Sequence, residues 1–298
     1  MSKGSHVIVT GASGFIGSFL VDNLISKGYS VIAISRSPKP KKGQDNKLQW
    51  CNWENISKFL ENGDFGVKAI FHLATDYGRN AAGKNYSEIE NANVVNPLKL
   101  LDLAVRYKIS KFISTDSFFS KPEFNYQHMR PYILTKSSFN EWGRHLSYVH
   151  DLFFLNVRLE HVYGPNDNKD KFIPYLINSL KKEERLKCTS CEQKRDFVYI
   201  SDVIDAYMTI LDADFSKKYT EIQVGTGYSI PLRDFIDFLI KELNCSSDLI
   251  EFGGIPQREN EIMNSYANLE SLSKLNWNAK ISYQDGIKML LSANGLNR

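Results

Sequence analysis

HVIVTGASGFIG, at residues 6–17, is the stretch that decides the fold of this 298-residue chain. Its first five residues predict a β-strand, and residues 15–27 carry apolar side chains at helical spacing up to Gly28. The three glycines between them allow a tight turn and a close approach of the backbone to a pyrophosphate, which the amino end of the helix then faces. The spacing is G-x-x-G-x-x-G rather than G-x-G-x-x-G, but the strand–turn–helix context predicts a dinucleotide site.

The rest of the first half alternates strand and helix signals, which predicts a parallel sheet with helices on both faces. Further strands are predicted at residues 29–35, 48–51, 69–73, 111–115, 152–158 and 221–224, and further helices at residues 93–107, 132–149, 172–182, 201–211 and 232–243. We therefore expect an α/β fold, a doubly wound (Rossmann) parallel sheet with a smaller C-terminal substrate lobe. The expected Rossmann domain is residues 1–162 with returning segments near 200–225, and the expected lobe is residues 163–199 and 226–298.

Composition narrows the class of protein. An apolar fraction of 42% is enough for a substantial core, and a net charge of +3 gives no reason to expect nucleic acid as a partner. We find no pattern of a signal peptide or a membrane span, so we expect a cytoplasmic protein without a membrane partner. Cys188 and Cys191 have metal-ligand spacing, but no second pair or nearby histidine completes four ligands, so we expect reduced thiols and no metal.

The end of the second predicted strand bears on the choice between NAD and NADP. An acidic residue there would bind the adenosine ribose hydroxyls and repel a 2′-phosphate. This chain has Ser35-Arg36-Ser37 instead, and a guanidinium pairs well with phosphate while the serines offer hydroxyl donors. The residues therefore favour NADP(H). We expect it to be bound by Gly11, Ser13, Gly14, Phe15, Ile16, Gly17, Ser35, Arg36, Ser37, Asn52, Leu73, Ala74, Tyr132 and Lys136.

Tyr132 and Lys136 are four residues apart, hence neighbours on one helical face. A free phenol has a pKa near ~10, too high for efficient proton exchange at neutral pH, and a nearby ammonium lowers that pKa. The pair alone would not stand out from chance, but residues 114–117 end a predicted strand, where open α/β sheets place their sites. Thr115, with Ser117 as the second choice, is expected to hydrogen-bond the substrate oxygen beside Tyr132. The sequence thus predicts redox chemistry on a carbonyl or an alcohol.

Taken in series, these motifs resemble the extended short-chain dehydrogenase/reductase family, in its nucleotide-sugar epimerase/dehydratase branch. The resemblance covers nearly the whole chain, through residues 10–17, 72–74, 114–116, 132–136, 158–165 and 195–197, with Asn93, Leu100, Leu101 and Arg258. Residues 125–132 and 158–165 are similar in particular to branch members that reduce the 4-keto group of a CDP-3,6-dideoxyhexulose with NADPH. That activity would serve O-antigen and lipopolysaccharide synthesis.

The resemblance also implies roles for single residues. Tyr132 would be the proton donor, Lys136 its partner and Thr115 the hydrogen-bond donor to the substrate. The implied substrate-binding set is Thr75, Thr115, Ser117, Tyr132, His161, Phe172, Arg195 and Arg258. The two arginines of this set would clamp the diphosphate, since guanidinium suits phosphate, with structural ion pairing as their alternative; Phe172 would lie near the base or in the core. His161 stands where the branch commonly has asparagine, and Ser117 where its 4,6-dehydratases have glutamate, which disfavours dehydration.

We therefore expect an NADPH-dependent 4-ketoreductase acting on a nucleotide-linked deoxyhexulose, as a homodimer. The cytosine base and the dimer rest on the resemblance. A dTDP-4-keto-6-deoxyhexose reductase and a 4-epimerase that retains NAD are the alternatives within the branch; Arg36 and the missing acidic residue weigh against the epimerase. A non-enzymatic NADP-sensing or scaffold protein would be free to lose the Tyr132–Lys136 pair, which this chain has kept.

Overall fold

The computed structural model describes residues 6–36, 46–61, 66–78 and 85–296. The chain forms two compact units. The first consists of residues 1–121, 129–158 and 207–222, and the second of residues 122–128, 159–206 and 223–298. Each helix within the described ranges is too short or too polar to pass through a lipid bilayer.

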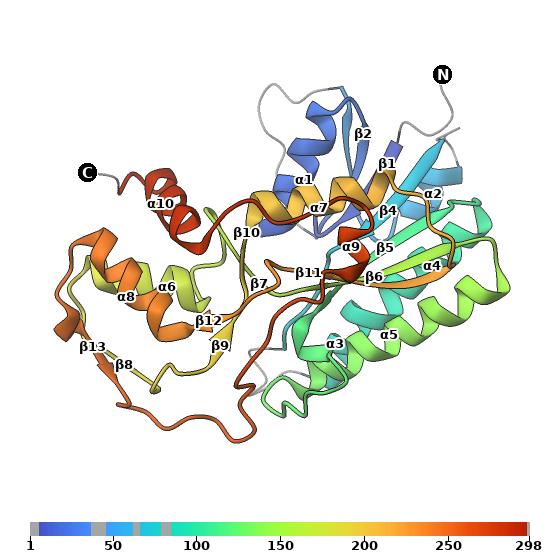
Figure 1. The fold of residues 1–298 in the computed structure, drawn as a ribbon. Coiled ribbons are helices and arrows are strands. Elements are labelled where there is room, and N and C mark those ends of the chain that lie inside the picture. The colour runs from blue at the N-terminus through green and yellow to red at the C-terminus, as the bar shows by residue number, and fades with distance from the viewer. Residues whose placement is uncertain (1–5, 37–45, 62–65, 79–84, 297–298) are drawn as a thin grey trace. The chain divides into compact units, whose positions relative to one another are not determined.

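The first unit is built on a seven-stranded sheet with the strand order β11-β6-β5-β4-β1-β2-β3 (Figure 1). Its strands are β1 His6–Thr10, β2 Ser30–Ile34, β3 Leu48–Cys51, β4 Val67–His72, β5 Lys111–Ser117, β6 Phe153–Leu159 and β11 Tyr219–Val224. Neighbours from β3 to β5 pair in parallel. The order β3-β2-β1-β4-β5-β6 is that of a doubly wound sheet, in which ligands lie at the carboxyl ends of the strands where the order reverses. The predicted α/β Rossmann class is confirmed.

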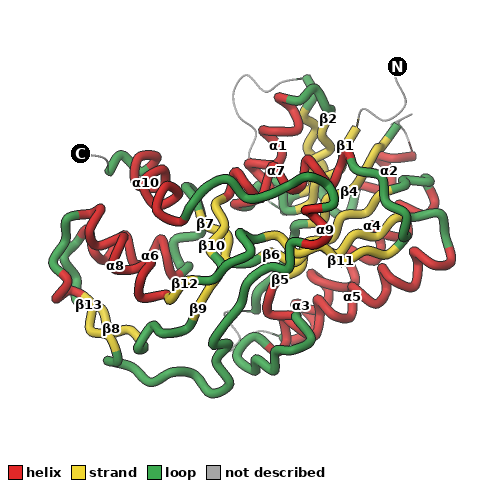
Figure 2. Tube along the Cα trace, in the orientation of Figure 1, coloured by secondary structure: helices red, strands yellow, loops and turns green. Residues whose placement is uncertain are grey.

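Helices cover both faces of this sheet (Figure 2). Those of the first unit are α1 Phe15–Ser26, α2 Ile56–Glu61, α3 Tyr86–Glu90, the π-helix η1 Asn91–Val95, α4 Asn96–Arg106, the 3-10 helix η2 Phe118–Ser120 and α5 Arg130–Val149. Apolar side chains of α2, α4 and α5 share one core with even-numbered strand residues such as Ile8, Ile70 and Phe112, because alternate residues of a strand face the same side. On the odd-numbered side, Phe71 of β4 packs against Tyr207 of α7 Ile200–Asp212 with ring centroids 5.5 Å apart.

The predicted strands agree with the observed ones to within about two residues, and two differences bear on the site. The strand β5 continues through Asp116 and Ser117, two residues beyond the predicted range of 111–115. The helix predicted at residues 93–107 is instead α4 preceded by the π-helical η1, so its first residues have a different register.

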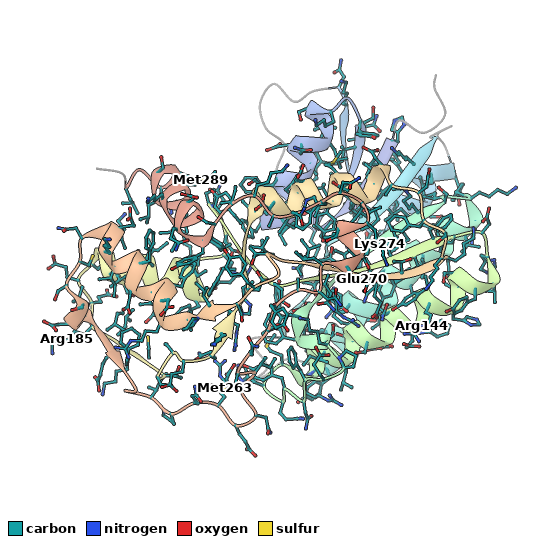
Figure 3. All side chains as sticks on the ribbon, viewed as in Figure 1. Arg144, Arg185, Met263, Glu270, Lys274 and Met289 are labelled. Carbon is teal, nitrogen blue, oxygen red and sulfur yellow. The ribbon has the colours of Figure 1, made fainter. Side chains whose placement is uncertain are left out.

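The second unit combines helices with three two-stranded sheets. Its strands are β7 His161–Tyr163, β8 Leu186–Cys188, β9 Lys194–Arg195, β10 Phe197–Tyr199, β12 Ile230–Pro231 and β13 Ile250–Phe252, and its helices α6 Phe172–Lys181, α8 Leu232–Leu243, the 3-10 helix η3 Ser247–Leu249, α9 Glu270–Ser273 and α10 Tyr283–Ala293. The buried carboxylate of Asp196 ties its loops together, because it accepts hydrogen bonds from the backbone N–H groups of Thr226, Gly227 and Ala267. On the surface of α9, Glu270 and Lys274 form an ion pair of 2.7 Å (Figure 3).

Candidate active site

The glycine turn after β1 has a geometry that side chains would destroy. Gly11 has a φ of +65°, in the left-handed region that favours glycine, and a Cβ there would lie 2.8 Å from the backbone N of Ala74. A Cβ on Gly17 would lie 2.1 Å from the carbonyl O of Gly11. The turn therefore fits tightly against both the first turn of α1 and the chain that follows β4.

The amino end of α1 suits an anionic group. Its N-cap is the exposed Gly14, and no described side chain caps it. Ser13, Phe15 and Ile16 flank it and are half-buried. Because the first N–H groups of a helix lack intrahelical partners and carry partial positive charge, this end can hold a pyrophosphate. The residues of the turn therefore fit a dinucleotide cofactor.

The carboxyl ends of β1 and β4 are joined by Thr10. Its Oγ1 accepts hydrogen bonds from the backbone N–H groups of Leu73 and Ala74, at 3.1 and 3.0 Å, and lies 2.8 Å from Nδ1 of His72. Burial lowers the pKa of His72 well below its usual value, with the Lys136 charge adding to the effect, so this imidazole is neutral. His72 is part of the packing, and Thr10 fixes the half-buried residues Leu73 and Ala74 beside the glycine turn.

Beyond β2, Ser35 is buried and its Oγ lies 2.6 Å from Oγ of Ser13 in the glycine turn. Arg36 follows with an exposed side chain, and Ser37 lies outside the described residues. Asn52, after β3, is exposed, and its Oδ1 accepts from the backbone N–H of Asn55 at 2.9 Å. The edge of the sheet where an adenosine would lie thus carries hydroxyls and a guanidinium, and no carboxylate at position 35 or 36.

Tyr132, Lys136 and Thr115 are brought together by α5 and β5. Nζ of Lys136 donates a hydrogen bond of 2.7 Å to the carbonyl O of Thr115 and lies 5.9 Å from the ring centroid of Tyr132. Both side chains of the pair are buried, with Tyr132 only 4% exposed. The i, i+4 spacing read from the sequence therefore corresponds to a real pair at the carboxyl end of β5.

The pKa of Tyr132 is raised well above its usual value, chiefly by burial and further by Tyr77 and the charge of Asp116. The hydroxyls of Ser117 and Thr75 act in the opposite direction. The expectation that the ammonium would lower this pKa is not met, because burial is the larger effect. A protonated phenol at neutral pH is the form that can give a proton to a substrate.

Burial also acts on Lys136, whose pKa it lowers to about 8, although the charge of Asp116 pulls in the opposite direction. An ammonium in such a site is close to its own titration, since burial in a medium of low dielectric disfavours the charged form. Lys136 is thus mostly protonated at neutral pH and loses its charge in mildly alkaline solution.

Sequence reasoning missed two tyrosines around this centre. The ring of Tyr77, in the loop after β4, is stacked on that of Tyr132 with centroids 5.2 Å apart. Tyr207, on α7, lies 2.6 Å from Oγ1 of Thr115 through its hydroxyl. Both tyrosines lie far from Tyr132 in sequence, in segments without a motif. The sequence therefore gave no indication of either contact.

The loop that carries Tyr77 is held by Asn93 of η1. The Asn93 amide accepts from the backbone N–H of Asp76 at 2.7 Å and donates to the Asp76 carbonyl at 2.8 Å. It also contacts Thr75 Oγ1 at 3.3 Å and donates to Thr135 Oγ1 of α5 at 3.0 Å. Asn93 matched the family pattern, which was a signal for its importance but not for this role.

Asp116 belongs to a buried charge network beneath the centre. Its carboxylate accepts from Nε of Arg158 at 3.2 Å, from Asn156 at 3.1 Å and from Oγ of Ser120 at 2.7 Å. Arg158 also donates to both carboxylate oxygens of Glu221, each at 3.0 Å. Arg158 thus gives the buried carboxylate of Asp116 the paired charge that burial requires.

The outer end of this network is half-exposed. Arg144 of α5 (labelled in Figure 3) lies over the ring of Tyr219 at 4.7 Å, and the Tyr219 hydroxyl donates to Glu221 at 2.8 Å. Burial alone would raise the pKa of Glu221, but the Tyr219 hydroxyl and the Arg158 guanidinium lower it. Glu221 thus stays ionised and forms a second ion pair with Arg158.

The remaining predicted substrate residues lie in the second unit. Arg195 is buried, with NH2 2.6 Å from Oε1 of Glu261 and NH1 donating to the carbonyl of Ile262. Arg258 is exposed and donates to the Tyr126 hydroxyl at 3.0 Å. His161 is half-buried with its ring edge-on to Phe197, and Phe172 is 41% exposed at the start of α6.

The sequence model of the NAD dependent epimerase/dehydratase family matches residues 7–225. The chain belongs to this family. The match includes the glycine turn and the Tyr132–Lys136 pair, and it ends before Arg258.

Within the family, two relatives share much of the sequence. The chain is 48% identical to CDP-abequose synthase of Salmonella typhimurium, over 96% of this chain and 97% of the relative. It is 41% identical to CDP-abequose synthase of Salmonella muenchen, with the same coverage. The resemblance to this enzyme is therefore close and extends through both units.

Solved structures of more distant family members have the same fold. UDP-glucose 4-epimerase of Thermotoga maritima superposes with a TM-score of 0.83 at 20% identity, over 97% of this chain and 98% of that one. MoeE5 in complex with UDP-glucuronic acid and NAD superposes with a TM-score of 0.84 at 23% identity, over 97% and 99%. At such identities the likeness concerns the fold alone.

Proposed function

We propose that this chain is an NADPH-dependent ketoreductase that converts CDP-4-keto-3,6-dideoxyhexose to CDP-abequose, a sugar donor for the O-antigen of lipopolysaccharide. The observation that carries the proposal is the buried phenol of Tyr132 beside Lys136. It occurs in a chain 48% identical to a CDP-abequose synthase over nearly its whole length.

The chemistry is divided between the cofactor and three side chains. NADPH, when bound, supplies the hydride that reaches C4 of the sugar. Tyr132 gives its proton to the C4 oxygen as negative charge develops there. The Lys136 ammonium stabilises both that charge and the phenolate left behind. The Thr115 hydroxyl gives a second hydrogen bond to the same oxygen.

Residues at the carboxyl ends of β1, β2, β3 and β4 would hold the cofactor. The glycine turn, formed by Gly11, Ser13, Gly14, Phe15, Ile16 and Gly17, would hold its pyrophosphate. We assign NADP rather than NAD because Ser35 and Arg36 provide hydrogen-bond donors without a carboxylate that would repel a 2′-phosphate. Asn52 would contact the adenine, Leu73 and Ala74 would line the cofactor, and Lys136 would hold the nicotinamide ribose.

We assign substrate recognition to Thr75, Ser117, His161, Phe172 and Arg258, as the resemblance implies. Arg258 is the one we assign to the diphosphate, since its side chain is exposed. Arg195 instead fits its alternative as a structural ion pair, because Glu261 and two backbone carbonyls occupy its guanidinium.

A panel of nucleotide sugars tests the proposal. Purified protein is incubated with NADPH and CDP- or dTDP-linked 4-keto sugars, and the products are identified by NMR. We expect stoichiometric NADPH oxidation and CDP-abequose from the CDP-3,6-dideoxy substrate. A preference for a dTDP-4-keto-6-deoxyhexose would show that the substrate is that sugar and not the CDP-linked one. Purified protein that carries tightly bound NAD and consumes no net NADPH would show that the enzyme is a 4-epimerase and not a reductase.

A cytoplasmic location and a homodimer complete the proposal. The apolar stripe of α5 is divided, with Phe139 in the core and Trp142 and Val149 exposed. Tyr148 is exposed beside them. A second copy could cover these exposed rings and methyl groups, and sedimentation of the purified protein checks the expected dimer.

A further inference from the structure

Among the described residues, the hydroxyl of Tyr207 has a single hydrogen-bond partner. It lies 2.6 Å from Oγ1 of Thr115, and the described part of the chain offers it no other hydrogen bond. The tyrosine is fully buried, with its ring edge-on to Phe71 of β4 at 5.5 Å. The contact joins α7 to β5 across 92 residues of sequence.

Proton counting decides which hydroxyl donates. A buried donor without an acceptor is costly, and within the residues that the structure describes the acceptor for the Tyr207 proton is Oγ1 of Thr115. Burial raises the pKa of Tyr207, so this proton is present throughout the physiological range. If Thr115 donated instead, the Tyr207 proton would be left unsatisfied in the interior. Tyr207 is therefore the donor, and the proton of Thr115 remains available.

Thr115 is thus held at two points. Its carbonyl accepts from Lys136 at 2.7 Å, and its hydroxyl accepts from Tyr207. The Thr115 side chain is half-buried, whereas the neighbouring Ser114 and Asp116 are buried. Tyr77 influences the pKa of both Tyr132 and Tyr207, so both phenols lie near the same side chain.

We propose that Tyr207 is a positioning residue: its hydroxyl donates to Thr115 and reserves the Thr115 proton for the carbonyl oxygen of the substrate. The inference rests on the proposed ketoreductase function and adds a residue to it. Donation from Tyr207 also polarises the Thr115 O–H, because hydrogen bonds in a chain strengthen one another. The effect is on the developing alkoxide, so it appears in kcat rather than in cofactor binding.

A double-mutant cycle tests this role through NADPH oxidation with the 4-keto sugar. Tyr207→Phe keeps the ring against Phe71 and removes only the hydroxyl; we expect kcat to fall about 2- to 10-fold, the effect of one hydrogen bond. Thr115→Val removes the donor to the substrate and is expected to lower kcat by about 100-fold or more. In the Thr115→Val background, Tyr207→Phe should cause no further loss of kcat, whereas in Thr115→Ser, which keeps the hydroxyl, its effect should return.

Tyr163→Phe is the matched control. Tyr163 is also buried, and its hydroxyl donates to the carbonyl of Tyr283 at 3.2 Å within the second unit. Its loss should lower the thermal midpoint as Tyr207→Phe does, but leave kcat unchanged. Thermal melts and NADPH affinity confirm that each variant is folded.

Two results would overturn the inference while the wild type remains an active reductase. One is a kcat of Tyr207→Phe equal to that of Tyr163→Phe. The other is an undiminished loss from Tyr207→Phe in the Thr115→Val background, which would mean that Tyr207 acts through general stability. A wild type that turns over none of the 4-keto sugars would instead reject the proposed function, and this inference with it.

Discussion

At the glycine turn, atoms are held in place by the backbone, whereas around Tyr132 they are held by side chains from several separate segments. The turn leaves no room for a Cβ on Gly17, 2.1 Å from the Gly11 carbonyl. The Tyr132 centre depends instead on hydroxyls and amides such as those of Tyr207 and Asn93. We therefore expect that adding a side chain to a glycine of the turn disrupts the turn. The Tyr132 centre, in contrast, should keep its shape when a single polar atom is removed.

The largest expected effect is that of Gly17→Val. Its side chain cannot avoid the Gly11 carbonyl, so the turn must open and α1 must move away from β1. We expect loss of NADPH binding below detection, with a lowered thermal midpoint or insolubility. Fluorescence titration with NADPH measures this. Ser26→Val, exposed on the same helix, is the control and should bind normally. Wild-type affinity in Gly17→Val would remove the distinction between the two regions.

Tyr132→Phe tests the second region. The ring still fills its buried place under Tyr77, while the proton donor is lost. We expect kcat to fall by about 10²- to 10⁴-fold with unchanged NADPH affinity. Steady-state kinetics and titration measure both, and Tyr148→Phe, an exposed tyrosine on the same helix, should behave as wild type. A nearly active Tyr132→Phe would defeat the assignment of the proton donor.

The buried Lys136 predicts a pH dependence of stability. Burial lowers its folded pKa to about 8 from its usual 10.5, so between these values the unfolded chain holds a proton that the folded protein has released. Stability contributed by this site therefore rises with pH across that window. Comparing urea unfolding of the wild type and Lys136→Met at pH 7 and 9.5, we expect the wild type to gain about 2 kcal/mol relative to the variant. An unchanged difference would mean that Lys136 is not desolvated.

The smallest effect concerns cofactor preference at the outer edge of the glycine region. Removing the exposed guanidinium in Arg36→Ala should raise KM for NADPH by about 10-fold and leave KM for NADH nearly unchanged, because only NADPH carries the 2′-phosphate. Lys58→Ala removes an equally exposed charge from α2 and should change neither value. Equal changes in KM for NADPH and NADH in Arg36→Ala would mean that another residue binds the 2′-phosphate.

The same contrast explains which parts of the fold and the site could be predicted from the sequence. The glycine turn and the strands around it were predicted closely, because a turn and its apolar flanks are local and their spacing reports their geometry. The pair Tyr132–Lys136 was found for the same reason, since one helical turn joins it. Tyr207 was not found, because its contact with Thr115 joins distant segments through a single hydroxyl. The pKa direction of Tyr132 was wrong, because the extent of its burial cannot be read from residue spacing.

The π-helical turn η1 makes residues 91–95 sensitive to insertions and deletions. Its extra residue aims the amide of Asn93 at the loop of Asp76 and at Thr135 together. Deleting one residue from 91–95 would restore an ordinary α-helix but rotate Asn93 by about 100° and leave that loop without its anchor. The extra residue of η1 thus keeps Tyr77 stacked on Tyr132 through the Asn93–Asp76 hydrogen bonds. Insertions and deletions in η1 should therefore be tolerated less well than substitutions nearby.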